Sequence, residues 1–124
     1  MSTLEVSNLN DGTTTVATTY ITNGSAKAWV NFNGTGTIAT RDSFNVASLT
    51  DVGTGDYKVT FSNAFANSNY ISVPASGRDA TTDTGNVCTI SYTTTTTDIS
   101  TFQYGANTRQ DVSLVGLANH GDLA

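Results

Sequence analysis

The sequence predicts an all-β protein, an antiparallel β-sandwich of the jelly-roll type, and three observations support this class. Threonine makes up 24 of the 124 residues, and its branched Cβ suits a pleated strand better than a helix. Apolar and polar side chains alternate through short segments, whereas no stretch has helical apolar spacing over three turns. Glycine and asparagine turn signals separate these segments. Together they predict roughly nine or ten strands, each of about five to eight residues.

The clearest element is Phe44–Phe65, which has the pattern of a β-hairpin. Its second half, Tyr57–Phe61, alternates apolar and polar side chains, so one face is apolar. Between the two halves, Asp51–Asp56 supplies glycines for positive φ and aspartates that bond their own backbone. The apolar phase slips once between Val46 and Leu49, which indicates a β-bulge.

The residues before this hairpin also alternate in short segments. Asn23-Gly24 is a strong hairpin turn signal, and Asn33–Gly36 predicts a second turn. In the strand between them, alanine, valine and phenylalanine share one face, which places Trp29 on the other. The strands expected here are Thr3–Ser7, Thr13–Thr22, Ala26–Phe32 and Thr37–Thr40.

After the hairpin, four further strands are expected. Pro74 should end the first of them, and Ala75–Asn86 is polar without apolar periodicity, which predicts a long surface loop. Thr93–Thr97 is either a turn or the exposed end of a strand, and Asn119–Ala124 is expected to be a tail. The strands predicted in this part are Tyr70–Val73, Val87–Tyr92, Ile99–Tyr104 and Asp111–Leu117.

Charge and cysteine content exclude several classes of function. Ten acidic and five basic residues give a net charge of −5, and an acidic chain without a basic stripe repels nucleic acid and anionic membranes. The first residues have neither a basic n-region nor an apolar h-region, and no segment approaches the length of a membrane span. We therefore expect no secretion signal and no membrane insertion. A lone Cys88 excludes an internal disulfide and a cysteine-based zinc site.

The hydrophobic core should be thin for a single domain of this length. Only 26 residues are Leu, Ile, Val or Phe. Each would contribute about 2 kcal/mol if buried. Against this stands a backbone entropy of roughly 1–2 kcal/mol for every ordered residue. A partner surface is therefore attractive, and self-association is the simplest one to propose.

The search for catalytic residues finds only weak candidates. His120 would complete a triad with Ser113 and either Asp111 or Asp122, but the expected tail offers no rigid frame to hold an imidazole against a nucleophile. Cys88 lies in the middle of a strand without a basic neighbour to lower its pKa, so a small buried hydrophobe is the better interpretation. We expect no enzymatic activity and no cofactor.

Two places are candidates for binding. Arg78, Asp79 and Asp83 share the long loop, where the arginine would contact a ligand carboxylate or sugar or stay solvated. The two aspartates and nearby hydroxyls would suit calcium, but the EF-hand order is absent and a solvated polar loop explains the same composition. Trp29 points away from the apolar face of its strand, so either a second layer covers it or it anchors an interface.

Several motifs follow one another over roughly residues 26–73, with looser similarity at both ends. They are AWVNFNGTGT at Ala28–Thr37, SFNV at Ser43–Val46, TDVGTGDY at Thr50–Tyr57, YKVTF at Tyr57–Phe61 and an A-F-x-N-x-x-Y run at Ala64–Tyr70. In this order they resemble the tail-fibre knobs and other appendage proteins of tailed bacteriophages. TLEVSNL at residues 3–9 also looks like the opening of such appendages.

The resemblance implies a non-enzymatic virion structural protein, a short tail or fibre knob that assembles as a homotrimer. It would be made in the bacterial cytoplasm and lie on the outside of the phage particle. Residues 1–22 would anchor the knob (23–124) to the particle or to sister subunits, with Leu4, Val6 and Leu9 as apolar contacts. The expected partners are further copies, other virion proteins and a host cell-surface receptor such as a glycan, faced by the loops around 76–84 and 93–97.

The resemblance leaves two other functions open, because no shaft of repeats separates the N-terminal segment from the knob. The same fold could decorate a phage capsid as a cement protein that clamps neighbouring shell subunits. A third hypothesis, from another class of function, is a carbohydrate-binding module or depolymerase fragment, with aromatic side chains as platforms for sugars.

Overall fold

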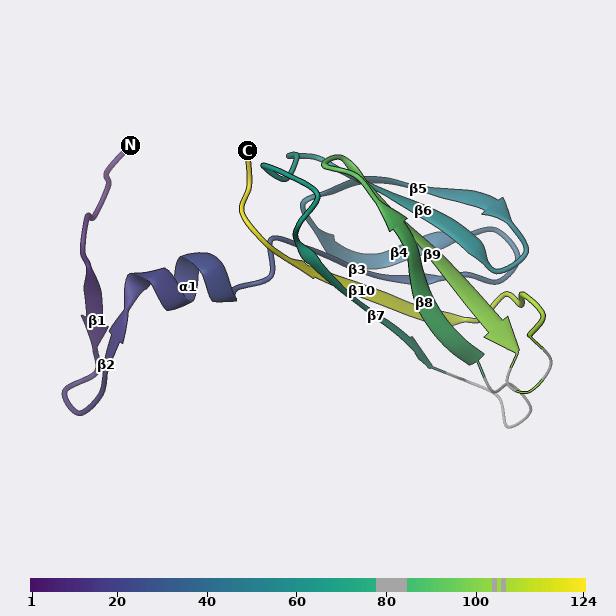
Figure 1. The fold of residues 1–124 in the computed structure, drawn as a ribbon, viewed down its shortest axis with the longest axis horizontal. Coiled ribbons are helices and arrows are strands. Elements are labelled where there is room, and N and C mark those ends of the chain that lie inside the picture. Colours follow the sequence, from purple (N-terminus) through teal and green to yellow (C-terminus); the bar gives the residue numbers. More distant parts are fainter. Residues whose placement is uncertain (78–84, 104, 106) are drawn as a thin grey trace.

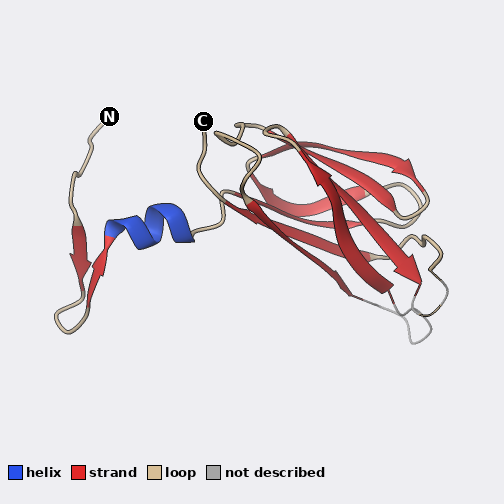
Figure 2. Ribbon diagram, viewed as in Figure 1, coloured by secondary structure: helices blue, strands red, loops and turns tan. Residues whose placement is uncertain are grey.

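The computed structural model describes residues 1–77, 85–103, 105 and 107–124, and only the backbone of 85–90. Within these residues, strands dominate and one short helix interrupts them (Figures 1 and 2). All paired strands are antiparallel, so the all-β prediction is confirmed. The elements are β1 (Asn8–Asn10), β2 (Thr15–Ala17), α1 (Thr18–Gly24), β3 (Ala28–Asn33), β4 (Ala39–Phe44), β5 (Val46–Gly53), β6 (Asp56–Phe61), β7 (Ile71–Gly77), β8 (Gly85–Tyr92), β9 (Thr96–Gln103) and β10 (Leu114–His120).

Two four-stranded sheets form the body of the protein, defined here as residues 26–124 (Figure 1). One has the strand order β4-β3-β10-β7 and is called the β3 sheet below. The other has the order β5-β6-β9-β8 and is called the β6 sheet. The small β1-β2 hairpin and α1 form a separate N-terminal arm, defined as residues 1–25, which extends away from the body (Figures 1 and 2).

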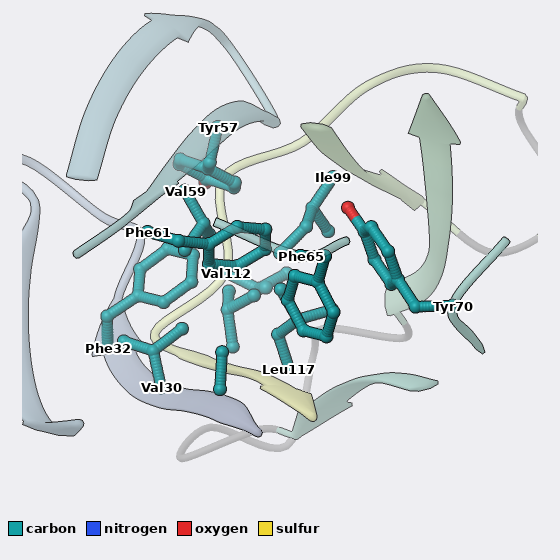
Figure 3. Close-up of a cluster of buried hydrophobic side chains, with 12 residues drawn as sticks. Val30, Phe32, Tyr57, Val59, Phe61, Phe65, Tyr70, Ile99, Val112 and Leu117 are labelled. Atoms are coloured by element: carbon teal, nitrogen blue, oxygen red, sulfur yellow. The ribbon is translucent and has the colours of Figure 1, made fainter. Parts of the chain in front are cut away.

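The core lies between the two sheets and consists largely of side chains that alternate inward along their strands (Figure 3). Phe32 of the β3 sheet and Tyr57 of the β6 sheet meet edge to face, with ring centroids 5.2 Å apart. Phe65 and Tyr70 stack at 4.1 Å near the other end of the core. The buried apolar side chains are Ala28, Val30, Phe32, Tyr57, Val59, Phe61, Phe65, Tyr70, Ile99, Val112, Val115 and Leu117.

The central hairpin was predicted correctly in its second half and incorrectly at its start. β5 and β6 pair as a hairpin, and the register shift between Val46 and Ser48 confirms the expected bulge. Phe44, however, ends β4 in the opposite sheet, and its side chain is exposed. The chain changes sheets at Asn45, whose φ of 56° bends the backbone between the two strands.

Several boundaries differ from the sequence-based expectation. The expected strand at Thr13–Thr22 ends at Ala17, and Thr18–Gly24 is helical instead. Pro74 does not stop β7, since this strand pairs only with β10 and an edge strand needs no hydrogen-bond donor on its open side. The predicted tail is also wrong at its start, because β10 continues to His120.

Candidate assembly surfaces

Hydrogen bonds within the N-terminal arm connect its hairpin with its helix. Ser7 accepts a backbone hydrogen bond of 2.9 Å from Thr18, which ties the strand to the start of α1. The carboxylate of Asp11 accepts hydrogen bonds from the backbone N–H groups of Thr13 and Thr14 at 2.9 and 2.7 Å and closes the β1-β2 turn. These bonds, chiefly that from Thr14, lower the pKa of Asp11.

The arm buries none of its apolar side chains. α1 has no buried residue, and an open hollow between the hairpin and α1 is lined by Leu9, Val16 and Ile21. Each apolar side chain left in water gives up the free energy that its burial would gain, and here several occur together on a short segment. The exposed large apolar side chains of this segment are Met1, Leu4, Val6, Leu9, Val16, Tyr20 and Ile21.

The arm meets the body at one end of the β3 sheet. Lys27 donates a backbone hydrogen bond of 2.8 Å to Asn119, and its ammonium group contacts the backbone oxygen of Ser25 at 3.2 Å. Nδ1 of His120 lies 3.1 Å from the carbonyl oxygen of Gly24, which makes this nitrogen the donor. The three contacts fix the point at which the arm leaves β3.

A row of apolar side chains crosses the outer face of the β3 sheet. Trp29 lies opposite Phe44 on β4 and Ala118 on β10, and Ala118 lies opposite Val73 on β7. Directly opposed residues project on the same side of a sheet. Phe44 is 54% exposed and Val73 is 52% exposed, and Ile71, two residues from Val73, is 62% exposed. The predicted outward orientation of Trp29 agrees with the half-buried side chain between buried Ala28 and Val30.

The described part of the outer face of the β6 sheet carries charged pairs, with the exposed Val52 beside them. Lys58 lies opposite Asp98, and their charged groups are 3.7 Å apart. Asp56 forms an ion pair with Arg109 and accepts a hydrogen bond from Ser100. Charged, mutually paired side chains of this kind are typical of a solvated surface. The two outer faces of the body therefore differ in chemistry.

The end of the body far from the arm is held together by Asp111. Its Oδ1 accepts hydrogen bonds from the backbone N–H of Gly55 at 2.6 Å and from the Tyr57 hydroxyl at 3.2 Å. Burial, together with the charge of Asp111, raises the pKa of Tyr57 to about 12. A shallow hollow beside this end is lined by Phe102, Gln103, Gly105 and Asn107.

Of the two loops expected to face outward, the threonine run at residues 93–97 lies within the described residues. Arg78, Asp79 and Asp83 lie outside the described residues. Thr94 accepts a hydrogen bond of 2.8 Å from the backbone of Phe65, so the threonine run lies beside the segment that follows β6. Thr93 caps this turn by accepting hydrogen bonds from backbone N–H groups two and three residues later, and the strand then resumes.

The catalytic candidates do not come together. His120 and Ser113 lie at opposite ends of β10, which separates them by roughly 20 Å at about 3.3 Å per residue. Asp111 lies near Ser113 and bonds the far-end turn, while Asp122 lies near His120. The side chain of Cys88 is outside the described part, although its backbone pairs with Ser100. Among the described residues, no group of three His, Cys, Asp or Glu side chains could hold a metal ion.

Sequence reasoning found Trp29 but missed the row to which it belongs. Ile71 and Val73 alternate with polar or small neighbours, and this pattern also fits a strand whose apolar side chains face the core. One residue distinguishes the inward from the outward orientation of Ile71 and Val73. Tyr70 directly precedes β7 and is buried, so the alternation places Ile71 and Val73 on the opposite, outer face. Leu4, Val6 and Leu9 lie on the arm with their side chains exposed.

Comparison with known proteins identifies no relative: no family model, no curated protein and no solved structure matches the chain. None of the helices in the part of the chain that the structure describes is long and apolar enough to cross a membrane.

Proposed function

We propose that this chain is a phage virion structural protein, a short homotrimeric tail or fibre knob of the β-sandwich type that mediates assembly and host-surface attachment. Its task is contact between surfaces, with no chemical transformation of a substrate. The proposal combines the resemblance of residues 26–73 to phage appendages with the form of the molecule. Two sheets packed around one core, with loops gathered at both ends, are the arrangement expected of a knob (Figure 1).

The observation that carries the proposal is the arm. A two-stranded hairpin is marginally stable in water by itself, and so is a helix of seven residues. The arm nevertheless adds no buried side chain to the core, and it exposes Leu4, Val6, Leu9 and Ile21. Ordering such a segment costs backbone entropy that only a further surface can offset. The arm is therefore an assembly element that anchors the body to sister subunits and to the particle.

The far end of the body is the proposed attachment surface. The turn at Gly53–Gly55 and the loop around Asn107 lie at the end away from the arm. A subunit anchored by its arm would present this end to its surroundings. Polar loops on a rigid scaffold are the usual location of binding residues.

Two measurements test the proposal. Light scattering of the purified full chain should give the mass of a homotrimer at micromolar concentration, and a stable monomer would contradict it. Electron microscopy of phage particles labelled with an antibody against the chain should place the label on the tail. A label on the shell would instead support a capsid decoration protein. If the particle is unlabelled and the purified chain binds a glycan array, the result would support a carbohydrate-binding module.

A further inference from the structure

We propose that the outer face of the β3 sheet is the binding surface for the arm of a second copy of this chain. This inference rests on the proposed function, since it names the partner and the surface of the proposed self-assembly. Each chain carries one apolar arm without a partner inside the described chain, and one apolar sheet face. Arm and face thus occur in equal numbers in any assembly of identical subunits.

The outer face of the β3 sheet is suited to burial. Its row includes the exposed side chains of Phe44, Val73 and Ile71 and the half-buried Trp29. The residues between them on β10 are small, with Gly116 and Ala118 at register positions opposite β7. Small residues allow another backbone to approach closely, while the large side chains at the rim supply apolar contact area. Aromatic side chains such as tryptophan are enriched in interfaces for this reason.

The charges favour this face over the other one. Arg41 and Asp42 are the ionised residues at its β4 edge, and the Arg41 guanidinium is already hydrogen-bonded to the Ser113 carbonyl oxygen at 2.7 Å. Covering the β6 sheet would instead desolvate ionised groups near its centre, including the Lys58–Asp98 pair. Such desolvation is costly unless every charge regains a partner.

The size of the face explains why the arm must take part. Four strands about 4.8 Å apart, each about seven residues long at roughly 3.3 Å per residue, give an area of roughly 450 Å². A standard stable interface buries about 800 Å² on each partner. A second copy that contacts the sheet face alone would bury less than this on each partner. In a head-to-tail assembly, each subunit buries both its own face and its own arm, so the arm adds the area that the face lacks.

The direction of the arm favours a neighbour over its own body. The arm continues outward from β3 and extends away from both sheets, and the contacts of Lys27 and His120 hold its root (Figure 1). An arm that reaches the next subunit forms a head-to-tail contact between two different surfaces. Contacts of this kind close into rings when the rotation between subunits permits, and a three-membered ring is the proposed homotrimer.

The first test places one negative charge on either face of the full chain. Val73→Asp should raise the dissociation constant of the oligomer at least about tenfold by light scattering over a dilution series. Val52→Asp is the matched control, because Val52 is a 61% exposed valine on the β6 sheet, and it should leave the oligomer unchanged. Equal effects of the two variants, or no effect of Val73→Asp, would overturn the inference. Circular dichroism checks that both variants retain a β-rich fold.

The second test detects the contact directly by disulfide formation in a Cys88→Ser background. Val6→Cys and Val73→Cys chains are purified separately, mixed and oxidised, and we expect a disulfide-linked pair that contains one of each, identified by mass spectrometry. A Val6→Cys and Val52→Cys mixture is the control and should give several-fold less. A cross-link in the control alone would place the arm elsewhere. If the wild type is oligomeric but the expected cross-link does not form, this inference is wrong and the proposed function is unaffected. If the wild type is monomeric, both are wrong.

Discussion

A single asparagine makes the corner between the two sheets. Asn45 has a φ of 56°, a left-handed conformation that asparagine tolerates better than most residues. Its amide nitrogen donates to the carbonyl oxygens of Lys27 and Asn63 at 3.0 and 3.1 Å, and its Oδ1 accepts from the Asn63 backbone at 2.7 Å. One side chain thus joins the start of β3, the β4–β5 corner and the end of β6.

We expect Asn45→Ala to lower the free energy of unfolding by about 2–4 kcal/mol, from left-handed strain and lost hydrogen bonds. Asn45→Gly accepts the positive φ and loses only the side-chain bonds, so it should cost about 1–2 kcal/mol. Urea denaturation of both variants measures the difference. If alanine and glycine cost the same, backbone strain is not part of the role of Asn45.

Tyr57 predicts a dependence of stability on alkaline pH. Burial, and next the charge of Asp111, raises the pKa of Tyr57 to about 12, and burial also raises the pKa of Tyr70. An unfolded tyrosine ionises near pH 10, so between pH 10 and about 12 the unfolded state loses protons that the folded state keeps. Stability should therefore be complete below about pH 10 and fall as the pH rises above it.

Urea denaturation of Tyr57→Phe between pH 7 and pH 11 tests this expectation. The variant should lose about 1 kcal/mol at pH 7, because the hydroxyl donates to the Gly34 carbonyl oxygen at 2.9 Å. Its stability should then fall less steeply than that of the wild type above pH 10. Tyr20→Phe, at an exposed tyrosine of the arm, serves as the control and should follow the wild-type profile.

The sequence predicts some of these residues and not others, for physical reasons. Alternation in YKVTF places Tyr57 inward, and alternation in AWVNF places Trp29 outward, because both strands have one buried face. Asn45 carries no such signal, since periodicity describes faces and not corners. The hydrogen-bond partners of Asp111 were also unpredictable, because they come from a turn 56 residues away in the chain.

At the scale of elements, the β5–β6 turn combines a positive φ with close backbone neighbours. Gly55 has a φ of 66°, and a Cβ at this position would lie 2.6 Å from the Thr101 carbonyl oxygen and 2.7 Å from the Gln110 backbone nitrogen. Gly36 has a similar φ of 63°, with nothing within 4 Å of the same position. The two glycines therefore separate the effect of backbone conformation from that of close approach.

We expect Gly36→Ala to cost about 1–2 kcal/mol, from left-handed strain alone. Gly55→Ala adds a clash with two backbone atoms that cannot rotate away, so it should cost about 3–5 kcal/mol in total. Thermal denaturation followed by circular dichroism would rank the two variants. Equal melting temperatures would mean that the backbone around Gln110 has room to move, contrary to the contacts of Gly55.

An element could be predicted where the residues that cause it lie next to one another in the sequence. The β5–β6 hairpin was predictable from its turn residues and its alternation. Helix α1 was not, because TTYITNG is rich in β-branched residues and has no acidic residue in its first turn or basic residue in its last. The continuation of β7 through Pro74 depends on its edge position in the sheet, which is a property of the assembled fold.

At the scale of the whole molecule, the sheets carry features that oppose strand-to-strand association at their edges. β5 has two register irregularities, β4 pairs with a bulge, and β7 contains Pro74. Bulges and prolines at sheet edges are known means of preventing edge pairing. In the proposed assembly, association is thereby directed to the arm and the outer face of the β3 sheet. Neither the strand order nor this division of surfaces could be predicted, because alternation fixes the buried face of a strand and leaves its neighbours open.

Removal of residues 1–25 tests the division of the molecule into arm and body. The arm contributes no buried side chain to the core, so the remaining chain should keep its β-rich circular dichroism spectrum and unfold cooperatively. It should also be monomeric by light scattering at concentrations where the full chain associates, because the sheet face alone is smaller than a stable interface requires. A truncated chain that fails to fold would make the arm part of the body. A truncated chain that still forms the full oligomer would show that the sheet face suffices without it.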